Sequence, residues 1–569
     1  MVDNQSEYLR AVVDMGSNGI RFSISNLQPP LTRILPTIYQ HRVGISLYDA
    51  QHPPGGTRRP IPDEVISAVT SSFQRFKRTC EDFGVLDENV DVIATEATRT
   101  APNSHEFRKR IKESTGWDVT LLSKEEEGRT GAMGVASSLP HVNGIVMDLG
   151  GGSTQLSWLS RQEESGEIVM PANGAVSMPY GAVAMSQRLQ EAEKTGTVQE
   201  LRKEVQSAVT AAYQHLDVPG NLQASAERLG GFTLYLSGGG FRGWGYLLMN
   251  QHRVSPYPVP VINGFKASRK EFLGTDHVRQ AAATALKEDE EDVFRISERR
   301  AGQVPAVAFL VDALAEALPQ VKEVRFCQGG VREGHIFSLM PREIAHQHPL
   351  VVATEQFDRT KSSSAVTDLL SAAFPPGSTS GAIDDYKSVF HTEMLKAFAN
   401  LLYYFSSHPK DLQATSALRS TTSGVLASAH GIPHEDRTLL ALLLCNRWGG
   451  DVAPSDKQFK HSLEQLIDSP WTLWWINYMA AVAQLIASVF PAGINQRNKD
   501  RMSLSAKWES HKKQQSHLSL RIDMDSASNA EAVEKETNAI EKVGKKKRWI
   551  GGKDGVGHKV SAQVFSQDQ

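Results

Sequence analysis

The sequence predicts an α/β fold made of two related halves, followed by a domain that is mostly helical. Three observations lead to this prediction. A segment with the plan strand, aspartate, glycine turn and strand occurs twice, at residues 11–25 and 145–158. Short apolar strands alternate with helix-like segments as far as residue 340, which is typical of an α/β domain. Beyond residue 340 the helical period dominates. A plan repeated at a domain-sized interval indicates a duplicated fold with a ligand cleft between its halves.

The first half is expected to cover residues 1–140. Its clearest helix is 63–83, because apolar residues such as Ile66, Val69 and Phe73 recur there at helical spacing. The other expected elements are strands at 9–14, 20–26, 32–42, 91–95 and 117–123 and helices at 104–114 and 124–137.

The second half is expected to cover residues 141–340 and to repeat the same plan. A glycine run at Gly238–Gly240 follows its apolar strand 232–236. The other expected elements are strands at 145–148, 155–160, 167–176 and 323–327 and helices at 183–192, 198–216, 241–250, 304–318 and 331–339.

The two glycine turns have the chemistry of a phosphate site. Glycine has no Cβ atom, so a glycine turn bends tightly and its N–H groups can approach an anion. An ordinary hairpin turn gives the same pattern, and each arginine could instead form a surface ion pair. The candidate phosphate-binding residues are Gly16, Ser17, Asn18, Arg21, Arg99, Gly150, Gly151, Gly152 and Ser153. The third glycine run, Gly238, Gly239 and Gly240, is the candidate nucleotide-binding turn, with Phe241 and Arg242 beside it to stack a purine; the alternative is an ordinary strand-to-helix turn.

Asp14 and Asp148 end equivalent strands and are the candidate metal ligands. Mg²⁺ keeps several waters and needs only one or two protein carboxylates, so two facing aspartates suffice. The alternative is that each aspartate accepts hydrogen bonds from its own turn.

Seven segments in a fixed order carry a resemblance to a known family. They read VVDMGSNGIRFSI, VIATEATRTAPN, LLSKEEEGRTGAMGV, VMDLGGGSTQLS, SMPYGAVAM, ISERRAGQVPAVAFLVDAL and GGVREGHIF. Together, over about residues 9–340, they resemble the exopolyphosphatase / guanosine pentaphosphate phosphatase (Ppx/GppA) family. The resemblance implies two actin-like (ribonuclease H-like) halves of the ATPase superfamily. It also implies Glu127, in SKEEEGR, as the catalytic general base; the residues alone do not separate Glu127 from Glu125 and Glu126.

One position departs from the family pattern. The second turn of the family continues Ser-Thr-Glu, whereas this chain has Gln155, which carries no charge and cannot act as a base. Two hypotheses follow. In the first, the wording of the motifs and the long helical extension resemble a signalling member of the family, which implies a regulator between mitochondria and nucleus that binds ATP or a related polyphosphate and acts on a regulatory protein partner. In the second, it is a Mg²⁺-dependent hydrolase of polyphosphate or guanosine pentaphosphate. A homodimer stays open in either case.

The C-terminal part is expected to contain a helical domain at 341–498 and a mostly disordered tail at 499–569. The helical domain resembles a degenerate HD-type phosphohydrolase, because His430, His434 and Asp436 lack metal-binding spacing. The apolar run 471–490 favours an amphipathic core helix over a membrane span. The tail composition is polar and basic, and the charges at 545–548 fit either a solvated run or an import or phosphate-binding patch.

Composition favours an ordinary globular, cytoplasmic protein. Its 40% hydrophobic content supports a large core, and a net charge of −3 points to neither nucleic acid nor an acidic membrane surface. The three cysteines, Cys80, Cys327 and Cys445, are too few and too far apart in sequence for a disulfide framework. No signal or transit segment is expected at the N-terminus.

Overall fold

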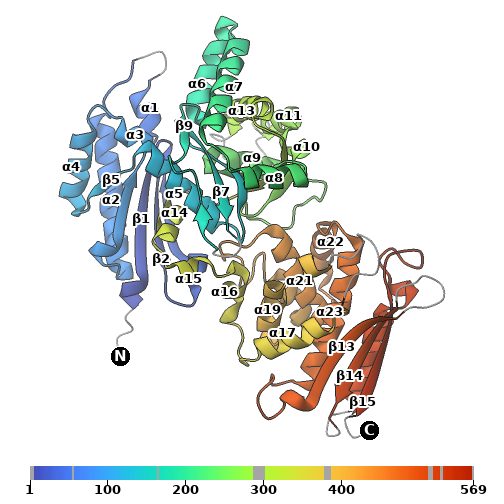
Figure 1. Ribbon diagram of the computed structural model, residues 1–569. Coiled ribbons are helices and arrows are strands. Elements are labelled where there is room, and N and C mark those ends of the chain that lie inside the picture. The colour runs from blue at the N-terminus through green and yellow to red at the C-terminus, as the bar shows by residue number, and fades with distance from the viewer. Residues whose placement is uncertain are drawn as a thin grey trace. The chain divides into compact units, whose positions relative to one another are not determined.

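A computed structural model describes residues 5–53, 57–162, 166–285, 301–376, 386–509, 517–525 and 530–566 (Figure 1). The chain divides into two compact units. The first contains residues 1–253, 261–349 and 429–433, and the second contains the remaining residues. Each unit is described separately below. Within the family motifs, only the start of ISERRAGQVPAVAFLVDAL lies outside the described residues.

The first half of the first unit is a five-stranded sheet with the strand order β3-β2-β1-β4-β5. The first three strands form an antiparallel meander, while β4 and β5 run parallel to β1. The strands are β1 (Leu9–Gly16), β2 (Gly19–Asn26), β3 (Thr37–Val43), β4 (Val90–Ala94) and β5 (Val119–Leu121). The helices are α1 (Leu47–Gln51), α2 (Asp63–Phe83), α3 (Glu96–Arg99) and α4 (Ser104–Thr115). Helix α2 buries Ile66, Val69 and Phe73 against the sheet, as their spacing predicts.

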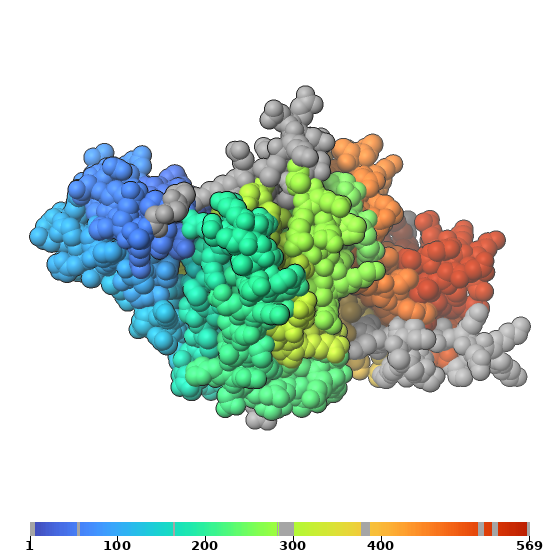
Figure 2. Space-filling model, turned by 90° about the horizontal axis from the view of Figure 1, so that it is seen from above, coloured from blue at the N-terminus to red at the C-terminus, as the bar shows by residue number. Residues whose placement is uncertain are grey.

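The second half repeats this topology. Its sheet has the order β11-β12-β10-β6-β7-β8, and the path β8-β7-β6-β10-β12 has the same strand directions as the sheet of the first half. The duplicated actin-like fold is therefore confirmed, and the two halves form adjacent lobes (Figures 1 and 2). The strands are β6 (Asn143–Leu149), β7 (Thr154–Arg161), β8 (Ile168–Val169), β9 (Val176–Met178), β10 (Phe232–Ser237), β11 (Lys266–Ser268) and β12 (Val321–Phe326). The helices are α6 (Ala182–Thr195), α7 (Val198–His215), α8 (Gly220–Leu229), α9 (Gly238–Asn250), α10 (Arg269–Phe272), α11 (Thr275–Ala285) and α13 (Val304–Ala317).

Two helices, α5 (Lys124–Ser137) and α14 (Val331–Ser338), cross at very short range in the middle of this unit. A Cβ atom added to Gly134 would lie 2.3 Å from the Gly330 carbonyl oxygen, and one added to Gly334 would lie 1.9 Å from that of Thr130. Because only glycine tolerates such contacts, these positions fix how closely the helices approach. Helix α5 carries Glu127, so this crossing positions the site.

Arg33 ties the first half to the end of α5. Its side chain is fully buried and donates to the carbonyl oxygens of Ser137 at 3.1 Å, Leu139 at 3.3 Å and Ala345 at 3.1 Å, the last in α15 (Arg342–Ala345). Burial lowers the pKa of Arg33 to about 9. Carbonyl groups at a helix C-terminus favour a cation, so the three bonds compensate part of this burial.

The helical part of the second unit is built around α23 (Pro470–Val489), whose Trp474, Trp475 and Tyr478 are buried. In the described part of the chain, α23 alone has the length and composition to cross a membrane, and 61% of its most apolar window is buried, as expected for a core helix. The other helices are α16 (Pro349–Glu355), α17 (Ser363–Ala372), α18 (Tyr386–Val389), α19 (Thr392–Leu401), α20 (Lys410–Arg419), α21 (His434–Arg447) and α22 (Lys457–Gln465).

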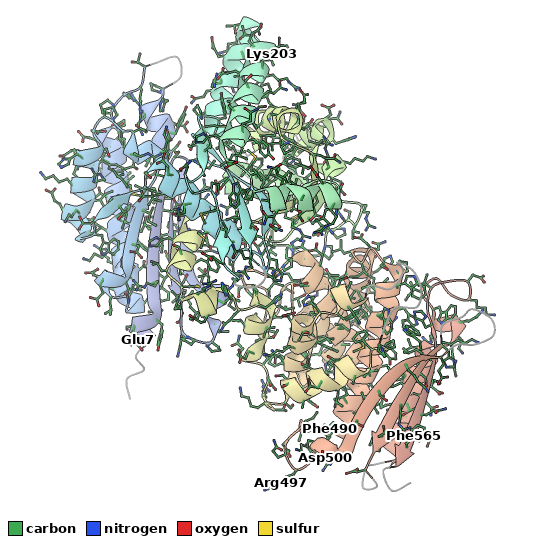
Figure 3. All side chains as sticks on the ribbon, in the orientation of Figure 1. Glu7, Lys203, Phe490, Arg497, Asp500 and Phe565 are labelled. Carbon is green, nitrogen blue, oxygen red and sulfur yellow. The ribbon has the colours of Figure 1, made fainter. Side chains whose placement is uncertain are left out.

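The prediction of a mostly disordered tail at 499–569 is wrong for the described residues. They form a sheet of β13 (Met502–Glu509), β14 (His517–Met524) and β15 (Lys559–Ser566), with α24 (Ala530–Val543) packed against α23 and β15. The apolar residues alternate along β13 and β14 and bury Leu504, Leu520 and Ile522. This period-two pattern is hidden by a polar composition. Phe565, near the end of β15, remains 37% exposed (Figure 3). The charges at 545–548 are also exposed, as a solvated run would be.

Candidate phosphate-binding site

The two glycine turns meet face to face in the first unit. The pairing of Gly16 with Gly19 leaves a two-residue turn, and the pairing of Leu149 with Thr154 leaves a turn of four residues. A Cβ atom added to Gly151 would lie 3.0 Å from Asn18 Cβ and 3.3 Å from Ser17 Cβ. A side chain at position 151 would therefore press against Ser17 and Asn18, so glycine favours the close approach of the two turns.

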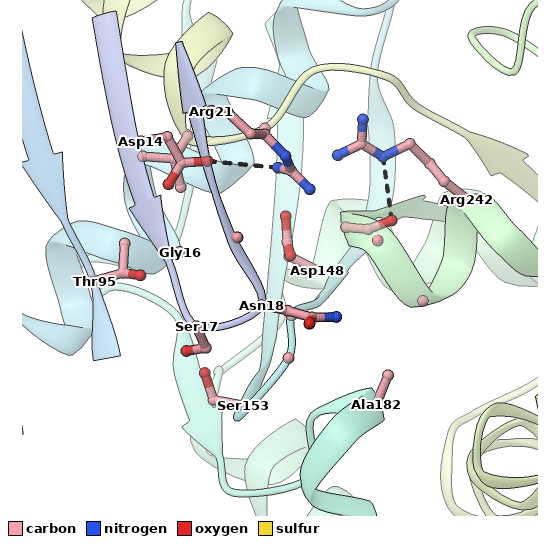
Figure 4. A pocket seen from close by; sticks show the side chains of 18 of the residues that line it. Asp14, Gly16, Ser17, Asn18, Arg21, Thr95, Asp148, Ser153, Ala182 and Arg242 are labelled. Carbon is pink, nitrogen blue, oxygen red and sulfur yellow. Dashed lines mark hydrogen bonds and ion pairs between the residues drawn. The ribbon is translucent and has the colours of Figure 1, made fainter. Parts of the chain in front are cut away.

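A pocket lies at these turns (Figure 4). The predicted residues in its lining are Asp14, Gly16, Ser17, Asn18, Arg21, Glu127, Asp148, Gly150, Gly151, Ser153, Gly238, Gly239 and Gly240. Sequence reasoning did not assign the following lining residues to the phosphate site: Gly19, Arg42, Thr95, Ala182, Arg242, Gln303, Gly330 and Val331. Both halves and the third glycine run thus contribute to one cavity.

Asp14 and Asp148 enter the pocket from equivalent strands. Asp14 is 5% exposed, and its Oδ2 lies 3.5 Å from Arg21 Nη1, on the residue paired with it across the hairpin. Burial raises the pKa of Asp14, although Arg21 and Arg332 oppose this effect. Asp148 Oδ2 accepts a hydrogen bond from the Ser237 hydroxyl at 2.5 Å. A cation would stabilise the buried Asp14 carboxylate and the partly buried Asp148 beside Ser237, and carboxylate oxygens are ligands that Mg²⁺ prefers.

Glu127 is the glutamate of SKEEEGR that reaches the pocket. Glu125 is exposed, and Glu126 forms a capping box with Ser123 at the start of α5. The Glu127 side chain is 11% exposed; its Oε2 accepts from Arg99 Nη1 at 3.1 Å and its Oε1 from Gln155 Nε2 at 3.3 Å. Burial raises the pKa of Glu127 to about 7, although Arg99 lowers it. A carboxylate with this pKa is matched to proton transfer near neutral pH.

Two predicted phosphate ligands lie outside the lining. Arg99 donates instead to Glu127 and to the Leu122 carbonyl oxygen, so in this structure it positions the candidate base. Gly152 faces Glu96, because a Cβ atom there would lie 2.5 Å from Glu96 Oε2. The stacking role suggested for Phe241 is wrong, since that ring is 1% exposed within the core.

Arg42 and Glu96 lie at the site but are not among the candidates from the sequence, whereas Arg242 is. Arg42 pairs with Arg21 across β2 and β3, and it donates to the Asn18 carbonyl oxygen at 3.0 Å. Glu96 comes two residues after the end of β4, where ligand sites of α/β sheets are usually found, and this position is a signal in the sequence. Arg242 is one turn into α9, and its Nε donates to the Gly238 carbonyl oxygen at 3.3 Å (Figure 4).

The HD-like residues have structural partners within their own units. His430 Nε2 lies 2.9 Å from the Ser137 hydroxyl in the first unit. His434 Nδ1 lies 2.8 Å from the Tyr257 hydroxyl in the second.

The Ppx/GppA phosphatase family matches residues 28–343, more than half of the chain, and the RTG2 C-terminal domain matches residues 348–567. The chain belongs to the Ppx/GppA phosphatase family. It is 37% identical over 497 residues to Retrograde regulation protein 2 of Saccharomyces cerevisiae, covering 86% of this chain and 82% of the yeast protein. It is 22% identical over 330 residues to a putative exopolyphosphatase of Haemophilus influenzae, covering 58% of this chain and 90% of that protein.

Among solved structures, the Ppx/GppA family member of Aquifex aeolicus is 21% identical and covers 58% of this chain and 96% of its own, with a TM-score of 0.43. An exopolyphosphatase of Cytophaga hutchinsonii has a TM-score of 0.42 at 18% identity, covering 58% and 97%. The fold assignment rests on the strand orders given above.

Proposed function

We propose that this protein is a phosphate-sensing regulator of retrograde signalling from mitochondria to nucleus, which binds ATP or a related polyphosphate in the cleft. The observation that carries the proposal is the meeting of the two glycine turns, with Gly151 against Ser17 and Asn18, around a pocket lined by both halves. Turn N–H groups of this kind bind phosphate oxygens. The signalling role follows the name of the yeast relative, which is similar over 86% of this chain.

The phosphate chain is the part of the ligand that this pocket is built to bind. Three guanidinium groups, those of Arg21, Arg42 and Arg242, lie in the lining. Arginine binds phosphate through several donors at once. The described lining contains no aromatic side chain, so base stacking contributes little there. We therefore expect ATP, guanosine pentaphosphate and inorganic polyphosphate to compete for one site.

Asp14 and Asp148 would hold Mg²⁺, because both are carboxylates at equivalent strand ends and Asp14 is buried with one guanidinium 3.5 Å away. The ion would supply charge neutralisation to the phosphate chain. The residues of the chain itself bind and orient this ligand.

Regulation is favoured over hydrolysis by the residue opposite Asp148. Gln155 pairs with Asp148 across the β6–β7 hairpin, is 6% exposed, and donates to Glu127 and to the Ser153 hydroxyl at 2.9 Å. With Arg99 on its other oxygen, the Glu127 carboxylate is held by two donors, which reduces its capacity to activate water. The cleft would therefore hold an uncleaved ligand for much longer than a hydrolase holds its substrate.

The second candidate function is Mg²⁺-dependent release of terminal phosphate with Glu127 as the general base. The raised pKa of Glu127, about 7, favours this function, because a large share of such a carboxylate is deprotonated at physiological pH and can accept a proton.

Calorimetry and phosphate release distinguish the two functions. Purified full-length protein is titrated with ATP, guanosine pentaphosphate and long-chain polyphosphate in Mg²⁺, and phosphate release is followed for the same ligands. A regulator binds at least one ligand and releases little phosphate, and Glu127→Ala leaves its affinity nearly unchanged. Release that falls by about 100-fold or more in Glu127→Ala would establish the hydrolase instead. Absence of binding by every ligand would refute both.

The same proposal includes a regulatory protein partner and a cytoplasmic location, since a signal between the two organelles passes through the cytoplasm. Imaging of a fluorescent fusion, and affinity isolation with and without ATP, test these two points. A fusion found only inside mitochondria would contradict the location.

A further inference from the structure

Ser17 and Glu96 form a pair at the edge of the pocket that the proposed function does not use. The Ser17 hydroxyl donates a hydrogen bond to Glu96 Oε2 at 3.0 Å, although 79 residues separate the two along the chain. Ser17 lines the pocket and is 8% exposed. The second half closes over the same oxygen, because a Cβ atom on Gly152 would lie 2.5 Å from it. The Ser17 hydroxyl thus belongs to a candidate phosphate-binding turn and contacts a carboxylate that can take its proton.

We propose that Ser17 accepts a phosphoryl group from the ligand bound in this cleft, with Glu96 as the base. The inference rests on the proposed function, because the donor is the phosphoanhydride of that same site. Glu96 takes the Ser17 proton, and Ser17 Oγ forms a bond to the terminal phosphorus. The bond from that phosphorus to its bridging oxygen breaks, and the electron pair leaves with the oxygen. ATP becomes ADP, polyphosphate becomes one unit shorter, and the chain carries phosphoserine at position 17.

The distance meets the requirement for an activated nucleophile, which is a hydroxyl within hydrogen-bond reach of its base. The other pocket hydroxyls lack this arrangement. Ser153 Oγ accepts from the Gln155 amide at 2.9 Å, and Thr95 Oγ1 donates to the Met15 carbonyl oxygen at 3.4 Å. Among the described residues of the pocket, Ser17 is therefore the hydroxyl that contacts a carboxylate.

Glu96 and Glu127 divide the acid–base chemistry of the cleft. The Glu127 carboxylate accepts hydrogen bonds from Arg99 and Gln155, whereas the Glu96 carboxylate accepts a hydrogen bond from Ser17. Transfer to Ser17 modifies the turn that binds the ligand and places two negative charges beside Asp14. A phosphorylated turn would repel a second ligand. The modification would therefore distinguish protein that has already bound ligand from protein that has not.

The test uses the full-length protein with Mg²⁺ and either γ-labelled ATP or labelled polyphosphate, with label counted per mole of protein and located by tandem mass spectrometry. We expect up to one phosphate per chain, on Ser17. Ser17→Ala should abolish it. Glu96→Gln should slow labelling by about 100-fold, because the amide still accepts the Ser17 hydrogen bond but is not a base. Glu96→Asp keeps a carboxylate and should label faster than Glu96→Gln.

Calorimetry on the same variants keeps the two proposals distinguishable. Glu96→Gln should bind ATP within about threefold of the wild type, since an amide replaces the carboxylate at nearly the same size. Wild-type protein that binds ligand but gains no label, or gains it on another residue, overturns the transfer and leaves the proposed function standing. Labelling of Glu96→Gln at the wild-type rate overturns the role of Glu96. Wild-type protein that binds no ligand overturns both proposals.

Discussion

The hairpins β1–β2 and β6–β7 have the same topology and different chemistry. In the first, Asp14 faces Arg21 across the strands, and the turn contains two residues. In the second, Asp148 faces Gln155, and the turn contains four residues that begin with three glycines. The backbone path is the same in both halves, because the strand order matches and each first strand carries its aspartate close to the turn. The residue opposite the aspartate has diverged, from a cation that faces the cleft to an amide that holds Glu127.

This difference teaches that the two halves supply different parts of one site. The first hairpin provides cationic donors for a ligand, since Arg42 lies beside Arg21 on the neighbouring strand. The second hairpin provides the longer glycine turn and fixes the candidate base through Gln155. The predictions below test this division of roles, from the largest expected effect to the smallest.

Gly151→Asp should weaken ATP binding by at least about 100-fold, which is roughly 2.8 kcal/mol. The new side chain would meet Ser17 and Asn18, whose Cβ atoms lie 3.3 and 3.0 Å from the position of the added Cβ, and its charge would repel phosphate. Calorimetry measures the effect. Gly44→Asp is the matched control, because a Cβ atom at Gly44 has open space around it. Equal losses in both variants would contradict a specific role for the second turn.

Gln155→Glu should raise Mg²⁺-dependent phosphate release by at least about tenfold. It gives the second hairpin a second carboxylate next to Asp148 and removes the amide donor from Glu127. Both changes favour a metal ion and a free base. Release is measured with and without EDTA. Gln155→Ala serves as the control, since it removes the amide without adding a charge; a gain in that variant as large as in Gln155→Glu would mean that the new carboxylate is unimportant.

Asp14→Asn and Asp148→Asn should each weaken ATP binding in Mg²⁺ about tenfold, because each removes one candidate ligand of a hard cation. In EDTA neither change should weaken binding. Asp63→Asn, at a side chain 91% exposed on α2, provides the control. A loss of affinity that persists in EDTA would mean that the aspartates accept hydrogen bonds from the turn backbone rather than bind a metal ion.

The residual phosphate release of the wild type should rise about fivefold from pH 6 to pH 7 and level off above pH 8. Burial raises the pKa of Glu127 to about 7, so the carboxylate is mostly protonated at pH 6 and mostly charged at pH 8. Only the charged form accepts a proton, and activity is therefore lost as the pH falls. A release rate that stays flat between pH 6 and pH 8 would exclude Glu127 as the base.

The C-terminal sheet shows where sequence reasoning failed and why. Composition between 499 and 569 is polar and charged, and this outweighed the alternation of Met502, Leu504 and Ala506 that marks a half-buried strand. The strands are stable because α24 packs against β15 and α17 packs against β13. Whether a polar segment finds such a surface depends on distant parts of the chain, and single-segment patterns do not report it.

The sequence by itself determined the duplicated plan, the two aspartates, the glycine turns and the acidic helix start Glu125–Glu127, while the structure separated Glu127 from its two neighbours. These are local features: a strand end, a turn N–H group and a capped helix start follow from a few consecutive residues. The tertiary structure alone decided that Arg99 turns toward Glu127, that Ser17 meets Glu96, and that Phe241 is buried in the core. The direction of a long side chain is set by what packs across from it, and for these residues the partners are 28 and 79 positions away or spread through the core.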